Sequence, residues 1–168
     1  MILIINGPCG IGKTTVAWEL VHRFDRAVML EGDSIGAVHP FEIYDDSRVE
    51  HLYQTLRRLI AFHIERGNYH NFVIDYVFER PESLARLKSL LADFDDHIHA
   101  FRLLVAPMEL EQRICERGED PAWHLRRAKE LVAIQTRAAR RGDVGAPVDT
   151  TGLSVAQAAD VIWQKVQT

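Results

Sequence analysis

Eight residues near the start of the chain, from Gly7 to Thr14, follow the pattern G-x-x-x-x-G-K-T. The apolar run Ile2 to Ile5 lies just before them and predicts a strand that is buried on both faces. A helix is predicted from Lys13 to about Phe24. A strand, a glycine-containing loop and a helix in this order are the context in which the pattern forms a phosphate-binding loop. This context restricts the fold strongly, because the end of a buried strand must meet the N-terminus of a helix.

Strand and helix patterns alternate along the rest of the 168 residues. Further strands are predicted at residues 28–30, 72–75, 98–105 and 148–150. Further helices are predicted at residues 48–66, 81–91, 107–118 and 121–140, and a last helix begins after Ser154. Residues 31–34 are predicted to be a loop, and Gly67 is predicted to cap the longest helix. The alternation predicts an α/β fold with about five parallel strands, helices on both faces, and one domain over residues 1–168.

Composition and charge exclude several classes of protein. The net charge of −4 leaves no basic surface of the kind that binds nucleic acid backbones, so no nucleic-acid partner is expected. No apolar run approaches the roughly 20 residues of a membrane helix, so no membrane association is expected either. The two cysteines, Cys9 and Cys115, are far apart in sequence and fit a reducing compartment. We therefore expect a cytoplasmic protein, and its oligomeric state stays open.

The residue types of the loop suit phosphate chemistry. Glycine lets backbone N–H groups curl around phosphate oxygens, and the helix N-terminus adds partial positive charge. Lys13 would add a full charge at the β- and γ-phosphates, and the Thr14 hydroxyl is suited to Mg²⁺. ATP and Mg²⁺ are thus the predicted cofactors. Cys9 is interpreted as a small spacer residue.

Other segments narrow the class of phosphate-loop protein. The N-K-x-D sequence of GTPases is absent from this chain, and Asp75 does not begin a D-x-x-G switch sequence, because Tyr-Val-Phe follows it. Four segments resemble the chloramphenicol phosphotransferase family: the N-terminal strand and loop, E-G-D-S-I at 31–35, V-I-D-Y-V-F at 73–78, and V-D-T-T at 148–151. The I-N-G-x-x-G-x-G-K-T start is also similar to tunicamycin-resistance ATP-binding proteins. A small kinase with the three-layer P-loop NTPase fold is what this resemblance implies.

The resemblance assigns roles to individual residues. Asp33 matches the catalytic base, which would accept the proton of a substrate hydroxyl. Lys13, Arg113 and Arg117 would stabilise charge on the transferred phosphoryl group, the two arginines from a helical lid at about residues 113–130. Independently of the resemblance, Asp75 ends an apolar strand, beyond which ligands of parallel sheets bind. Thr14 and Asp75 are therefore the expected magnesium residues, although a contact of Asp75 with substrate stays open. The residues expected to hold the nucleotide are Gly7, Pro8, Cys9, Gly10, Ile11, Gly12, Lys13, Thr14, Thr15, Arg113, Thr150 and Thr151.

Several questions stay open from the sequence alone. Arg126 and Arg127 are equally good candidates to approach the site from the other side of the lid. Glu31 and Glu79 are expected to be solvated, and Trp18 is expected in the core.

The leading functional hypothesis is a phosphotransferase acting on a hydroxyl of a small molecule, which could be antibiotic-like, a sugar acid or a nucleoside. One alternative is a nucleoside monophosphate kinase, although few arginines lie between residues 35 and 60 to bind an acceptor phosphate. The other is an ATP-binding sensor module without phosphoryl transfer. The identity of the phosphate acceptor cannot be read from the sequence.

Overall fold

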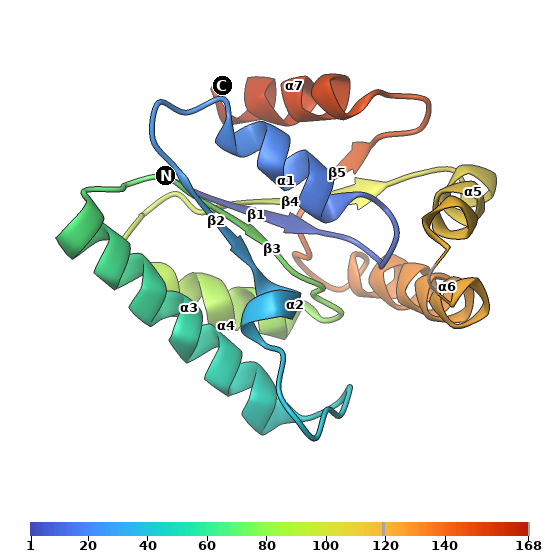
Figure 1. Cartoon of the computed structure of the whole chain (residues 1–168), viewed down its shortest axis with the longest axis horizontal. Coiled ribbons are helices and arrows are strands. Elements are labelled where there is room, and N and C mark those ends of the chain that lie inside the picture. Colours follow the sequence, from blue (N-terminus) through green and yellow to red (C-terminus); the bar gives the residue numbers. More distant parts are fainter. Residues whose placement is uncertain (119, 168) are drawn as a thin grey trace.

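The computed structural model describes residues 1–118 and 120–167. Its strands form one five-stranded sheet in the order β2-β3-β1-β4-β5, and every neighbouring pair is parallel (Figure 1). The strands are β1 (Ile2–Asn6), β2 (Val28–Glu31), β3 (Phe72–Asp75), β4 (His99–Leu104) and β5 (Ala146–Asp149). The predicted α/β fold with a parallel sheet is therefore confirmed.

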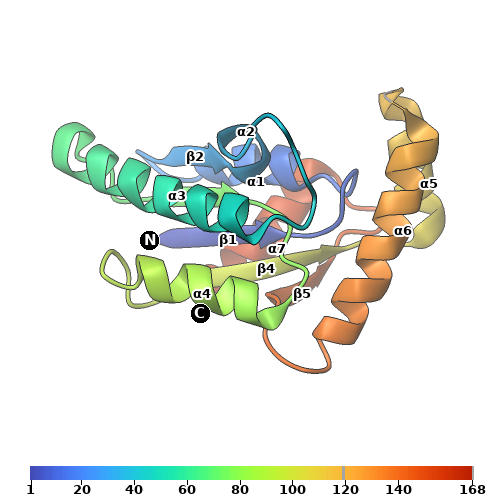
Figure 2. The same cartoon turned by 90° about the horizontal axis from the view of Figure 1, so that it is seen from below.

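Helices cover both faces of the sheet. The helices are α1 (Lys13–Val21), α2 (Gly32–Ile35), α3 (Asp46–Gly67), α4 (Pro81–Leu91), α5 (Pro107–Arg117), α6 (Pro121–Ala138) and α7 (Val155–Val166). Helices α1 and α7 lie on one face, and α3 and α4 lie on the other (Figure 1). Helices α5 and α6 pack against each other and stand across the end of the sheet at which the strands finish (Figure 2). Within the described residues, no helix is long and apolar enough to span a membrane.

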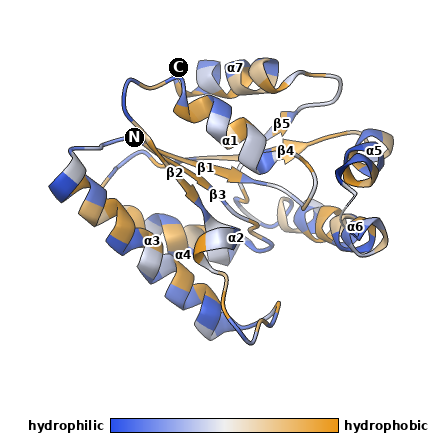
Figure 3. Ribbon diagram, in the orientation of Figure 1, coloured by the Kyte–Doolittle hydropathy of each residue, from blue (hydrophilic) through white to orange (hydrophobic). Residues whose placement is uncertain are grey.

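The central strand β1 divides the core into two layers because successive side chains point to opposite faces. Leu3 and Ile5 pack into a cluster with α1 and α7, whereas Ile2 and Ile4 pack into a cluster with α3 and α4. All four side chains are almost completely buried. Figure 3 shows that the strands are mainly apolar and that the covering helices have mixed polarity. Burial on both faces explains why β1 has no polar residue before Asn6.

Three local predictions need correction. The segment after β2 is the short helix α2 rather than a loop. A helix of four residues is too short to show a helical periodicity in the sequence, so it could not be predicted. Helix α3 includes Gly67, and the left-handed cap is Asn68, with φ 52°. Trp18 is not in the core: it is 51% exposed on α1, although neighbouring Ala17 and Leu20 are buried.

Candidate active site

The phosphate-binding loop connects β1 to α1, and two of its glycines are required by geometry. Gly10 and Gly12 have φ values of 77° and 102°, a region that strains other residues. A Cβ on Gly10 would also lie 2.3 Å from Cγ1 of Ile114 on α5. Glycine at position 10 therefore allows both the turn of the loop and its close approach to α5.

Lys13 lies at the centre of this loop and is only 8% exposed. Its Nζ donates a hydrogen bond to the carbonyl oxygen of Pro8 at 3.2 Å. Burial lowers the pKa of the Lys13 ammonium, whereas the nearby carboxylates of Asp33 and Asp75 raise it. The loop thus holds a buried cation whose charge is only partly compensated by the protein.

The next residue, Thr14, is held by carboxylates from two strand ends. Its hydroxyl donates to Oδ2 of Asp75 at 2.5 Å and lies 3.5 Å from Oε1 of Glu31. Burial raises the pKa of Asp75, and the hydrogen bond from Thr14 opposes that shift. Oδ1 of Asp75 is buried and accepts no hydrogen bond from the described residues. Glu31 was expected to be solvated, but it is half-buried beside Thr14, because β2 and β3 are neighbours and end together.

A cavity of about 650 Å³ opens over this loop. Asp33, from α2, faces the same cavity as Lys13 and Thr14, which is the placement expected of a base. The cavity is lined by Cys9, Gly10, Gly12, Lys13, Thr14, Thr15, Glu31, Asp33, Phe41, Arg48, Arg113, Arg117, Trp123 and His124. The remaining loop residues lie behind the surface: Gly7 and Ile11 are buried, and Pro8 accepts the bond from Lys13.

A second cavity, of about 350 Å³, adjoins the other side of the loop. It is lined by Gly10, Ile11, Gly12, Thr15, Val16, Arg113, Thr150, Leu153, Ser154, Val155 and Ala158. Thr150 therefore lies beside the loop, as expected. Thr151 does not line this cavity; its hydroxyl donates to Asp149 at 2.6 Å and accepts from the backbone N–H of Ala106 at 2.9 Å.

Arg113 and Arg117, the two arginines expected to form part of a lid, come from α5. Arg113 borders both cavities, and its Nη1 donates to the carbonyl oxygen of Ile11 at 2.8 Å, so α5 is fastened to the phosphate-binding loop. Arg113 also pairs with Glu109 one turn earlier. Arg117, one turn further along α5, lines the larger cavity. The i, i+4 spacing thus places both arginines on the side of α5 that borders the larger cavity.

The structure distinguishes the two arginines of α6. Arg126 is exposed, whereas Arg127 is half-buried and forms ion pairs with Glu79 and Glu130. Its Nη1 also donates to the Tyr44 hydroxyl at 3.3 Å. Glu79, expected to be solvated, is therefore paired. Neither arginine lines the larger cavity, but the charge of Arg127 lowers the pKa of Cys9 against the raising effect of burial.

Asn6, the last residue of β1, connects the loop to distant segments, and its sequence context alone predicts no role for it. Its Nδ2 donates to the carbonyl oxygens of Phe78 and Val144 at 3.1 and 2.9 Å. Its Oδ1 accepts from the backbone N–H of Gly7 and Phe78 and from Nε2 of Gln135. Asn6 is completely buried. One amide therefore fixes the start of the loop, the exit of β3 and helix α6 together.

We expect Asn6→Ala to lower the free energy of unfolding by about 2 to 4 kcal/mol, because it leaves several buried polar groups without partners. Urea denaturation followed by circular dichroism measures this effect. Asn71→Ala is the matched control, since that side chain donates one exposed hydrogen bond to Arg26. Equal stability of the two variants would contradict the central role of Asn6.

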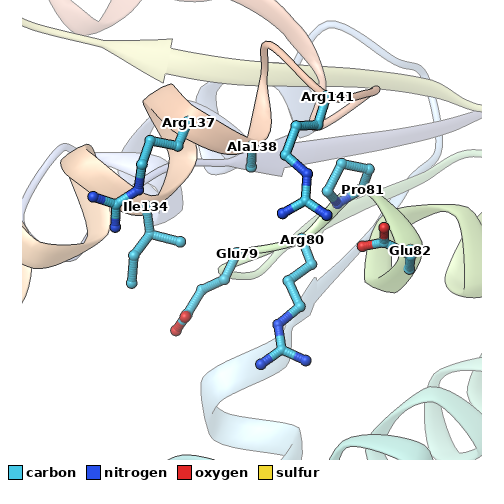
Figure 4. Close-up of a pocket in the computed structure, with 8 residues that line it drawn as sticks. All are labelled: Glu79, Arg80, Pro81, Glu82, Ile134, Arg137, Ala138 and Arg141. Atoms are coloured by element: carbon cyan, nitrogen blue, oxygen red, sulfur yellow. The ribbon is translucent and has the colours of Figure 1, made fainter.

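A separate cavity of about 470 Å³ lies between α6 and the start of α4 (Figure 4). Three arginines border it: Arg80 before α4, and Arg137 and Arg141 from the end of α6 and the turn after it. All three are exposed. The residues that line this cavity include none from the phosphate-binding loop, so it is distinct from the nucleotide cavity.

Comparisons with solved structures agree with this geometry. The tunicamycin resistance protein of Deinococcus radiodurans has 20% identity and a TM-score of 0.64, over 99% of this chain and 95% of that one. A sugar kinase from a Janibacter species has 12% identity and a TM-score of 0.65, over 99% and 94%. A gluconokinase from Sinorhizobium meliloti has 14% identity and a TM-score of 0.65, over 98% and 94%. No curated protein sequence matches the chain.

At these identities the neighbours establish the fold. They confirm the predicted resemblance to small P-loop kinases, with a tunicamycin resistance protein among them. The family model described as "AAA domain" matches residues 2–141, which include the phosphate-binding loop, all strands but β5, and helices α5 and α6. The chain therefore belongs to the AAA domain family and has the P-loop NTPase fold.

Proposed function

We propose that the protein is an ATP- and Mg²⁺-dependent phosphotransferase that moves the γ-phosphate of ATP to a hydroxyl of a small molecule. The observation that carries this proposal is one shared cavity: the carboxylate of Asp33 faces the same space as Lys13 and Thr14. The presence of a sugar kinase and a gluconokinase among the structural neighbours supports a small-molecule acceptor. The candidate acceptors are an antibiotic-like compound, a sugar acid and a nucleoside.

The nucleotide would lie across the phosphate-binding loop. The backbone N–H groups of the loop and the N-terminus of α1 would bind the phosphates, and the Lys13 ammonium would exchange the Pro8 carbonyl for phosphate oxygens. The smaller cavity, bordered by Arg113 and Thr150, is the proposed site of the adenine. Thr151 would contribute through its backbone carbonyl oxygen, because its hydroxyl and its backbone N–H both already donate to Asp149.

The donors around Thr14 fit a magnesium ion. The Thr14 hydroxyl and the Asp75 carboxylate are hard oxygen ligands, and one Asp75 oxygen is buried without a hydrogen-bond partner among the described residues. Among the described residues, no group of three or more His, Cys, Asp or Glu side chains is placed to hold a metal. Nucleotide phosphates and water would complete the coordination, and the bound ion would neutralise charge on the β- and γ-phosphates.

The chain's own residues would then carry the transfer. Asp33 would accept the proton of the acceptor hydroxyl as that oxygen forms a bond to the γ-phosphorus. The bond between the γ-phosphorus and the β–γ bridging oxygen would break, and ADP would leave with that oxygen. Lys13, Arg113 and Arg117 would stabilise the negative charge on the phosphoryl oxygens during this step.

We further propose that α5 and the start of α6, about residues 113–130, act as a lid within a single domain spanning residues 1–168. These helices stand over the ends of the strands (Figure 2). Gly118 ends α5 in a left-handed conformation with φ 77°, and Asp120 caps α6 by accepting a hydrogen bond from the N–H of Trp123. Trp123 also lines the larger cavity, so closure of the lid would exclude water from it.

A coupled ADP-release assay over a panel of sugar acids, nucleosides, nucleoside monophosphates and antibiotics tests the proposal. The expected result is at least one acceptor that raises ADP release well above the rate with water alone. Uniform release at the water rate, with ATP bound, would overturn the phosphotransferase proposal and favour an ATP-binding sensor module. Transfer only to nucleoside monophosphates would favour the nucleoside monophosphate kinase.

The magnesium assignment makes a separate prediction. Asp75→Asn should raise the Mg²⁺ concentration for half-maximal ADP release by about tenfold or more. Loss of a carboxylate that holds the metal directly, or through a ligand of the metal, lowers metal affinity by about that factor. Affinity for ATP measured without Mg²⁺ should change little. A titration of ADP release against Mg²⁺ provides the measurement, and Asp96→Asn, an exposed aspartate before β4, is the control. An unchanged Mg²⁺ requirement would remove Asp75 from the metal site.

A further inference from the structure

One cation of the larger cavity has no role in the mechanism above. Arg48 lies in the first turn of α3, on the side of the cavity that also carries Asp33 and Phe41. It is only 8% exposed. Burial of a guanidinium is costly unless a hydrogen-bonded anion compensates its charge.

The contacts of Arg48 within the described residues are neutral. Its Nε donates to the carbonyl oxygen of Glu42 at 3.3 Å, and the ring of Phe41 lies 4.7 Å from its Cζ. Its charge also lowers the pKa of Tyr76, which burial raises. None of the ion pairs in the described part of the chain joins Arg48 to a carboxylate. By contrast, Arg57 on the same helix pairs with Asp93 although it is much more exposed.

The position of Arg48 separates it from the cations that face the nucleotide. Lys13 lies in the phosphate-binding loop, and Arg113 and Arg117 lie on the lid helix α5. Arg48 is carried by α3, which packs under the opposite face of the sheet from α1. Its environment is also partly apolar, since Phe41 covers one face of the guanidinium. The guanidinium therefore borders the part of the cavity that remains for an acceptor.

We propose, on the basis of the function proposed above, that the acceptor is a hydroxy acid: its carboxylate binds Arg48 while its hydroxyl lies at Asp33. A planar guanidinium matches a carboxylate through two parallel hydrogen bonds, and one positive charge balances one negative charge. A phosphate monoester carries close to two negative charges, whereas the other cations that line the cavity, Lys13, Arg113 and Arg117, come from the phosphate-binding loop and α5 and are proposed to bind the nucleotide. The aromatic contact favours a compact acid over a large polyanion.

The test is calorimetric binding to the wild-type protein with a non-hydrolysable ATP analogue present. The probes are aliphatic and sugar-derived hydroxy acids, each paired with its uncharged primary amide, and a phosphorylated alcohol. The expected result is at least one acid that binds about 100-fold more tightly than its amide. Arg48→Gln should remove that preference, and Arg48→Lys should restore only part of it because lysine lacks the planar fork. Arg58→Gln, an exposed position of the same helix, should keep the wild-type preference.

Several results would overturn this inference. Equal binding of acid and amide would do so, as would an unaltered preference in a folded Arg48→Gln protein. Binding of the phosphorylated alcohol in place of the acids, or no binding by any probe, would also do so. If Arg48→Gln does not fold, the comparison of acid with amide on the wild-type protein still decides. If only an uncharged acceptor supports ADP release, the phosphotransferase proposal stands and the hydroxy-acid inference is overturned. If a hydroxy acid binds through Arg48 but supports no ADP release, the hydroxy-acid site stands and the phosphotransferase proposal is overturned.

Discussion

Replacing Lys13 with alanine is expected to reduce ATP turnover by at least about 100-fold to 1000-fold, the effect typical of losing one preorganised charge-stabilising donor. Lys13 is the buried cation of the phosphate-binding loop, and burial means that water does not screen its charge strongly. Affinity for ATP should fall as well, because the phosphates would face a loop without its full positive charge. ADP release and calorimetric ATP binding measure the two effects.

The stability of the Lys13→Ala protein separates this loss from misfolding. Burial lowers the pKa of the Lys13 ammonium, which means that the surroundings disfavour its charged form. Removing it should therefore leave the thermal midpoint of the nucleotide-free protein unchanged or slightly raised. Lys88→Ala is the matched control, because Lys88 forms an ion pair with Asp143 far from the loop in sequence. Normal ATP binding and turnover in a folded Lys13→Ala protein would contradict the phosphotransferase, the nucleoside monophosphate kinase and the sensor module alike.

The fold was largely predictable because its strands are buried on both faces. The run from Ile2 to Ile5 has no polar interruption, a pattern typical of the centre of a parallel sheet. Capping residues also gave helix starts correctly: Asp120 and Ser154 cap α6 and α7 as predicted. Trp18 was placed wrongly because helical periodicity identifies a face only when enough apolar residues mark it, and α1 has few turns.

The candidate site was predictable only in part. A parallel sheet brings the carboxyl ends of neighbouring strands together, so the meeting of Asp75 with the phosphate-binding loop followed from topology. The ion-pair partners of the arginines on α6 could not be predicted, because Arg126 and Arg127 are adjacent in sequence and differ only in the direction of their side chains. Arg127 reaches Glu79, from a segment nearly fifty residues away, and no local pattern signals such a pair.

Arg48 and Asn6 show a different limit of sequence reasoning. Counting the arginines between residues 35 and 60 was useful for judging a phosphate site, but a count does not show which guanidinium is buried without an anion. Asn6 satisfies hydrogen-bond groups from three segments, and those segments meet only after folding. The signal available in the sequence was a lone polar residue at the end of an otherwise apolar strand, directly before the glycine of the loop.

Asp33→Asn is the substitution that most sharply separates phosphoryl transfer from simple nucleotide binding. Asparagine has nearly the same shape as aspartate but does not accept the proton of the acceptor hydroxyl, so kcat should fall by about 100-fold to 10,000-fold. Asp33 is exposed and lines the larger cavity together with Lys13, so its negative charge would face the proposed position of the γ-phosphate. Removing that charge should leave ATP affinity unchanged or increase it. Single-turnover transfer to an acceptor, with ATP binding measured separately, provides the test.

Loss of transfer with unchanged or tighter ATP binding makes the prediction specific, because general damage to the site would weaken binding and transfer together. A protein that only binds ATP would show the tighter or equal affinity without any activity to lose. Asp25→Asn, an exposed aspartate before β2, is the matched control and should behave as wild type in both measurements. If Asp33→Asn retains full transfer, the proton must go to another acceptor, and Glu31, beside Thr14 on the wall of the same cavity, becomes the residue to replace next.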